Sequence, residues 1–103
     1  MSNFIKVAES KDIAPGEAKT VKAKDREIAI YSVGGKIYAT ESGCPHRGGP
    51  LGEGYLEGRV ITCPWHGWRF DVISGATEVN PDVRIKSYDV KQEGNDILVK
   101  LED

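Results

Sequence analysis

The chain has 103 residues, 29 % of them charged, and a net charge of −2. This length fits one domain and leaves no room for a second, catalytic domain. The near balance of charges argues against nucleic acid and anionic membranes as partners. The first residues contain neither a basic segment nor a long apolar run, so we expect no signal peptide and no membrane span.

The predicted elements are β-strands, with one possible helical turn near the N-terminus. In chain order, we expect a strand at 4–7, a helical turn at 10–13, strands at 17–23, 27–33 and 36–40, a hairpin within 55–62, and strands at 84–91 and 96–101. Gly34-Gly35, Glu57-Gly58 and Glu93-Gly94-Asn95 supply the turns between neighbouring strands. Short hairpin turns need residues that accept positive φ, which glycine does. The pattern predicts an all-β domain.

All cysteines and histidines of the chain lie in two short segments. The first segment is Cys44-Pro45-His46 and the second is Cys63-Pro64-Trp65-His66, with 16 residues between His46 and Cys63. Each segment begins with Cys-Pro and ends with His. Because the chain uses these residue types nowhere else, Cys44, His46, Cys63 and His66 are the candidate ligands of one metal centre.

Two thiolates and two imidazoles fit either a structural zinc ion or a two-iron cluster. Zinc takes a tetrahedral Cys₂His₂ set. A 2Fe–2S cluster can have two cysteines on one iron and two histidines on the other. Common zinc fingers group Cys with Cys and His with His, whereas here each segment carries one of each. The spacing therefore favours a two-iron cluster held from two sides.

The segments CPHRGGPL (44–51) and CPWHGWRFD (63–71) resemble the two cluster-binding loops of Rieske proteins. Residues 80–82, Asn-Pro-Asp, resemble the proline-containing third loop of that family, and 88–99 resemble its closing hairpin. The resemblance implies a single Rieske (ISP-like) domain over 1–103. Its fold would be an antiparallel β-sandwich base with a cluster-binding subdomain inserted at roughly 41–72.

The resemblance also implies a role for each ligand. Cys44 and Cys63 would bind the inner iron of one 2Fe–2S cluster per chain, and His46 and His66 would bind the outer iron. With both cysteines assigned to metal, no disulfide remains, which favours a reducing, cytoplasmic setting. Glycines crowd the same region, and we expect them to let backbone N–H groups approach sulfur; they are Gly43, Gly48, Gly49, Gly52, Gly54 and Gly67.

Two departures separate the chain from the respiratory branch of the family. It lacks the extra cysteine pair of that branch, and it has Trp68 and Phe70 where those proteins place hydroxyl groups near the cluster. Hydrogen bonds to sulfur stabilise the reduced state, so their loss lowers the potential. We expect Trp68 and Phe70 to pack and to shield the cluster from water. The chain resembles a soluble, low-potential ferredoxin.

The expected function is electron transfer rather than catalysis. The resemblance implies a monomeric carrier that takes single electrons from a flavin-dependent ferredoxin reductase to a terminal, aromatic-ring oxygenase. No segment suggests a nucleotide loop, a nucleophile with a base or a mononuclear iron site. Two alternatives stay open: a small Rieske subunit held permanently in a reductase or oxygenase complex, and a structural zinc module.

Overall fold

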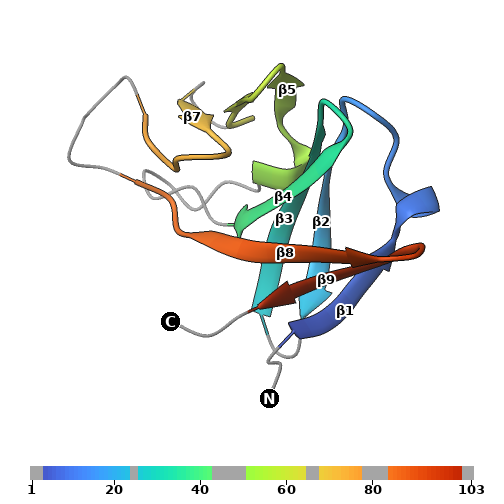
Figure 1. Ribbon diagram of the computed structural model, residues 1–103. Helices are drawn as coiled ribbons and strands as arrows, with labels where there is room; N and C mark the ends of the chain where they lie inside the picture. Colours follow the sequence, from blue (N-terminus) through green and yellow to red (C-terminus); the bar gives the residue numbers. More distant parts are fainter. Residues whose placement is uncertain (1–3, 24–25, 43–50, 65–67, 78–83, 101–103) are drawn as a thin grey trace.

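The computed structural model describes residues 4–23, 26–42, 51–64, 68–77 and 84–100, which form nine strands and two short 3₁₀ helices (Figure 1). No helix among these residues is long and apolar enough to cross a membrane. The elements are β1 (Phe4–Glu9), η1 (Ser10–Asp12), β2 (Ala18–Ala23), β3 (Arg26–Val33), β4 (Lys36–Glu41), η2 (Leu51–Glu53), β5 (Tyr55–Glu57), β6 (Val60–Thr62), β7 (Arg69–Asp71), β8 (Ser87–Glu93) and β9 (Asp96–Lys100).

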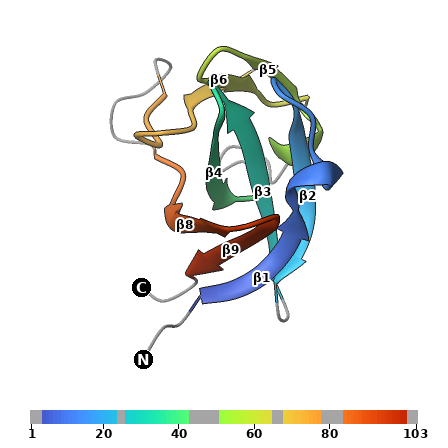
Figure 2. The ribbon, with the colours of Figure 1, turned by 45° about the vertical axis from the view of Figure 1, so that its right-hand side comes forward.

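Six strands form the base, in the order β1-β9-β8-β4-β3-β2. The first and last strands pair, with Phe4 opposite Lys100, while β4 and β8 meet only at Ala39–Tyr88 and Thr40–Ser87. Because that junction is short, the sheet folds into two halves that face each other, β1-β9-β8 and β2-β3-β4 (Figure 2). This arrangement confirms the predicted all-β class and antiparallel sandwich base.

The central strand β3 is buried on both faces. Side chains alternate along a strand, so Ile28 and Ile30 point into the core between the two halves of the base, together with Ile97 and Val99. Ala29 and Tyr31 point the other way, into a second core. All four side chains of this run are fully buried. This explains why 27–33 is rich in β-branched and aromatic residues along its whole length.

The second core lies between the outer face of β3 and a small sheet in the order β5-β6-β7 (Figure 1). Each strand of this small sheet has three residues. Strands this short bury little surface on their own. The second core, defined here as the buried side chains shared by the small sheet and the base, comprises Ala29, Tyr31, Leu51, Ile61, Cys63, Phe70, Val72 and Ile85.

The predicted turns are present. Gly34 and Gly35 connect β3 and β4 with φ of 57° and 85°, and Gly58 and Gly94 begin the other two hairpin turns with φ of 61° and 59°. The predicted helical turn appears as η1. These positions have the backbone conformation that glycine tolerates without strain.

Two features of the strand prediction were wrong. The sequence did not indicate β7, whose three residues contain one buried side chain, Phe70. The strand predicted at 84–91 was expected to begin at Arg84, but the corresponding strand β8 begins at Ser87. Residue Ile85 instead donates its N–H to the carbonyl of Gly75 at 2.9 Å. The chain therefore belongs to the small sheet at Ile85 and joins the base only afterwards.

Candidate metal centre

Of the four candidate ligands, the described residues contain Cys63. Its side chain is 1 % exposed and follows directly after β6. Cys44, His46 and His66 lie outside the described residues, as does the third-loop segment 80–82. Within the described ranges, no three His, Cys, Asp or Glu side chains gather as a metal-binding group. The geometry that can be examined is therefore that of Cys63 and of the points where each loop joins the fold.

Each predicted cluster loop is closed at its root by one backbone hydrogen bond. The N–H of Leu51 donates to the carbonyl of Ser42 at 2.9 Å, across the ends of segment 43–50. The N–H of Cys63 donates to the carbonyl of Trp68 at 2.7 Å, across the ends of segment 64–67. A loop whose ends are fixed loses less conformational entropy when it is ordered further by a ligand. Both loops thus start from a preformed frame.

The ends of the third segment are fixed in the same way. An isolated bridge between Ala76 and Arg84 spans segment 78–83. A second bridge pairs Thr77, just before the segment, with Phe70 of β7. The roots of the first and third segments are also joined to each other. Glu41 donates its N–H to the carbonyl of Lys86 at 2.8 Å, and its carboxylate accepts the N–H of Lys86 at 2.7 Å. Sequence reasoning missed Glu41, because a polar residue at a strand end carries no distinctive pattern.

Cys63 has an apolar environment. It belongs to the second core, with Leu51, Ile61 and Phe70 among its members, and Trp68 packs against that core. The rings of Trp68 and Phe70 lie 6.4 Å apart at 36°. Phe70 is fully buried. The expected packing role of Phe70 and Trp68 is therefore confirmed.

A buried hydrogen-bond chain links β3 to the end of β4. Thr40 Oγ1 donates to the carbonyl of Glu41 at 2.9 Å, so it accepts from the Tyr31 hydroxyl at 2.8 Å. Both side chains are fully buried. Burial raises the pKa of Tyr31 above its ordinary value, and the hydrogen bond with Thr40 offsets part of that rise. The tyrosine is neutral and fixes the end of β4, from which segment 43–50 leaves.

Asp71 organises the chain that leaves β7. Its Oδ1 accepts the N–H groups of Ile73 and Ser74 at 2.8 Å and 3.1 Å, and its Oδ2 accepts Arg59 Nε at 2.7 Å. Burial raises the pKa of Asp71, but the hydrogen bonds from Arg59, Ser74 and Ile73 outweigh it and hold that pKa below its ordinary value. The carboxylate thus ties the β5–β6 turn to the path toward segment 78–83.

Two of the glycines expected to approach sulfur have another role. A Cβ at Gly52 would lie 2.7 Å from the backbone nitrogen of Thr20 in β2, and one at Gly54 would collide with the carbonyl oxygen of Thr62. Both contacts are closer than a side chain permits. Gly52 and Gly54 therefore let η2 sit directly on β2 and β6. The other four glycines of the predicted set lie outside the described residues.

The residues present fit an iron–sulfur cluster. The described part supplies the buried Cys63 side chain at the root of one loop. The sequence supplies one further thiol and two imidazoles in loops that leave the same frame. A thiolate in apolar surroundings needs a positive charge nearby, and a metal centre supplies that charge when the thiolate binds it. The donor set matches the mixed Cys₂His₂ ligation of Rieske centres.

Comparisons with known proteins agree with this interpretation. Residues 3–89 match the family model of the Rieske [2Fe-2S] domain. The ferredoxin component of the naphthalene 1,2-dioxygenase/salicylate 5-hydroxylase systems of Ralstonia sp is 43 % identical, over 97 % of each chain.

Solved structures give the same result. The ferredoxin of carbazole 1,9a-dioxygenase from Nocardioides aromaticivorans has a TM-score of 0.89 at 29 % identity, covering 98 % of this chain and 100 % of its own. A chain in the complex of reduced oxygenase and oxidized ferredoxin in carbazole 1,9a-dioxygenase has a TM-score of 0.89 at 32 % identity, covering 100 % and 97 %. The present chain belongs to the Rieske [2Fe-2S] domain family.

Proposed function

We propose that this chain is a soluble, low-potential Rieske ferredoxin that carries single electrons from a flavin-dependent reductase to a terminal, aromatic-ring oxygenase. The observation that carries the proposal is the likeness over almost the whole chain to a dioxygenase ferredoxin component, at 43 % identity. A solved relative of the same fold is seen together with its oxygenase. The chain would act as an electron carrier in the cytoplasm, and not as an enzyme.

The proposed centre is one 2Fe–2S cluster in a single domain, 1–103, with the cluster-binding subdomain at roughly 41–72. Cys44 and Cys63 would bind one iron, and His46 and His66 the other. When bound, the cluster accepts and releases one electron per cycle. The protein holds the ligands: the Cys63–Trp68 and Leu51–Ser42 hydrogen bonds fix the loop ends, so little of the chain has to rearrange between redox states.

The apolar second core supports a low potential. Reduction adds negative charge, and charge is less stable where apolar side chains exclude water. Phe70, fully buried in the same core as Cys63, has no hydroxyl to donate to sulfur. We expect a midpoint potential on the order of −150 mV, at the lower end of the Rieske range. Phe70→Tyr should raise it if the new hydroxyl reaches a cysteine sulfur.

Metal analysis together with spectroscopy tests the proposal. Anaerobically purified protein should contain two irons and two acid-labile sulfides per chain and should show the visible absorption and EPR signals of a Rieske centre. Colourless protein with stoichiometric zinc would overturn it. Size-exclusion chromatography should show a free monomer; stable co-purification with a reductase or oxygenase would instead indicate a permanent subunit.

A further inference from the structure

A surface groove runs between the start of β2 and the edge strand β5. Gly16, Glu17 and Ala18 line one side, and residues 54–57 line the other. Its volume is about 570 Å³. Figure 2 shows the segment before β2 beside strand β5 at the top of the molecule. None of the lining residues belongs to the predicted ligand set.

The backbone of β5 is available on the groove side. Glu57 pairs with Val60 around a two-residue turn, and Tyr55 pairs with Thr62. In such a hairpin the pair that closes the turn exchanges both hydrogen bonds, and the next pair exchanges none. The N–H and C=O of Leu56 therefore point away from β6. Because β5 is the end of its sheet, these groups can accept a further strand.

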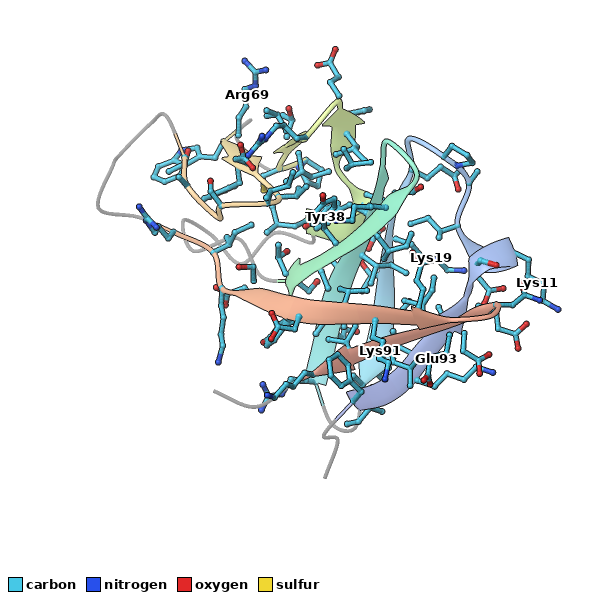
Figure 3. All side chains as sticks on the ribbon, viewed as in Figure 1. Lys11, Lys19, Tyr38, Arg69, Lys91 and Glu93 are labelled. Carbon is cyan, nitrogen blue, oxygen red and sulfur yellow. The ribbon has the colours of Figure 1, made fainter. Side chains whose placement is uncertain are left out.

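The side chains of the groove select for positive charge. Tyr55 is 72 % exposed, the highest value among the large apolar side chains that the structure describes. Glu57 is exposed, and within the described residues it has no ion pair or hydrogen-bond partner. Glu17 accepts the N–H of Ala14 at 2.8 Å through Oε1, which leaves Oε2 free to accept another donor. The Lys19 side chain of β2 (Figure 3) donates instead to the carbonyl of Asp12, at 3.2 Å.

We propose that this groove binds an extended, positively charged segment of a partner protein. The segment adds to the edge of β5 through the backbone of Leu56, covers the ring of Tyr55, and places Arg or Lys side chains against Glu17 and Glu57. Charge complementarity decides the occupant: the two charged side chains that line the groove, Glu17 and Glu57, are both carboxylates.

The test is an NMR titration of the full, cluster-loaded chain with a short blocked peptide of alternating arginine and threonine. We expect saturable shifts confined to residues 16–18 and 54–57, with slowed exchange of the Leu56 amide. The double variant Glu17→Lys, Glu57→Lys should bind the peptide about tenfold more weakly or worse. The matched control, Glu27→Lys with Asp89→Lys on the base, should bind it as the wild type does.

A charge-swapped peptide completes the test. An alternating glutamate and threonine peptide should fail to bind the wild type and should bind the double-lysine variant at the same residues. The proposal is overturned if the arginine peptide gives no shifts, if its shifts spread over the carboxylates of the base, or if the control pair weakens it equally. Unchanged visible absorption in every variant shows that the fold and the cluster are intact.

Discussion

The base and the small sheet reach their structures by different means. Strand β3 of the base has eight residues and lies between two cores, whereas β5, β6 and β7 have three residues each and one core. Burial of apolar surface is the main stabilising contribution in a domain. The base can therefore be stable by packing alone. The small sheet depends on its contact with the base, on the loop roots, and on the proposed cluster.

Loss of a cluster ligand should produce the largest difference in stability between the base and the small sheet. Cys63→Ser removes a buried side chain that we propose as a ligand and should abolish cluster assembly, because metal binding is coupled to folding. Hydrogen exchange should then become fast at residues 55–62 and 69–72 but stay slow in β3 and β9. Mass spectrometry of exchanged peptides measures this directly.

Removing iron from the wild type with a chelator should reproduce the same exchange pattern. Uniform protection of both regions in the Cys63→Ser variant would show that the small sheet does not need the cluster.

Truncation of the two cores gives the next largest effect. Phe70→Ala leaves a cavity in the second core, and Ile97→Ala leaves one in the core of the base; both side chains are fully buried. Phe70→Ala should lower the free energy of unfolding by about 3–5 kcal/mol, and Ile97→Ala by about 2–5 kcal/mol. In guanidinium, Phe70→Ala should lose visible absorption well before far-UV circular dichroism. Ile97→Ala should lose both signals together, and coincident curves for Phe70→Ala would contradict the comparison.

A smaller effect is expected at the boundary between the regions. Tyr31→Phe leaves Thr40 without its donor and should cost about 1 kcal/mol. Because the pKa of Tyr31 is raised in the folded protein, the stabilisation is complete below the unfolded value of about 10 and is lost as the pH rises above it. Between about pH 8 and about pH 11, the denaturant midpoint should fall less steeply with pH in the variant than in the wild type.

Tyr38 provides the control for that measurement. It lies opposite Tyr31 on β4 and packs at the margin of the second core. Tyr38→Phe should leave both the stability and its dependence on alkaline pH as in the wild type. Equal effects of the two substitutions would mean that the hydrogen bond between Tyr31 and Thr40 is not the cause.

The smallest effect concerns the Asp71 contacts. Asp71→Asn keeps an oxygen for the N–H groups of Ile73 and Ser74 but loses the charged bond to Arg59, whose side chain is 54 % exposed. Exposed pairs contribute little, so the cost should stay below about 1 kcal/mol. The lowered pKa of Asp71 means that its contribution is present above the unfolded value of about 3.9 and disappears as the pH falls.

Chemical unfolding at neutral pH and at acidic pH measures the difference between Asp71→Asn and the wild type. The two proteins should differ at neutral pH and converge in acid. A difference that persists below the folded pKa of Asp71 would mean that the substitution acts through shape and not through charge.

The parts of the fold that sequence patterns predicted are those with strong local signals. The Gly34-Gly35 turn and the apolar run of β3 identified the central hairpin correctly. The strand β7 has a single buried residue, Phe70, and forms because β6 and the second core lie beside it. Such a strand depends on tertiary contacts and carries no periodicity.

The same distinction between local signals and tertiary contacts applies to the candidate site. Residue type and spacing predict Cys63 and its partners as the ligand set, because few side chains bind soft metals. The frame that holds them could not be predicted: Glu41 contacts Lys86, and Gly52 contacts Thr20, at separations that only the folded chain brings together. The sequence did not indicate these contacts of Gly52 and Gly54, since a glycine pattern does not reveal which atoms approach.

The closed loop roots have a consequence for engineering and for evolution. Ser42 with Leu51, and Cys63 with Trp68, join through main-chain atoms, which every residue except proline can supply at the donor position. What lies between the roots can therefore change without altering how it is attached. Loops from relatives of higher potential should be interchangeable with those of this chain, so that one scaffold supports a series of carriers tuned to different donors.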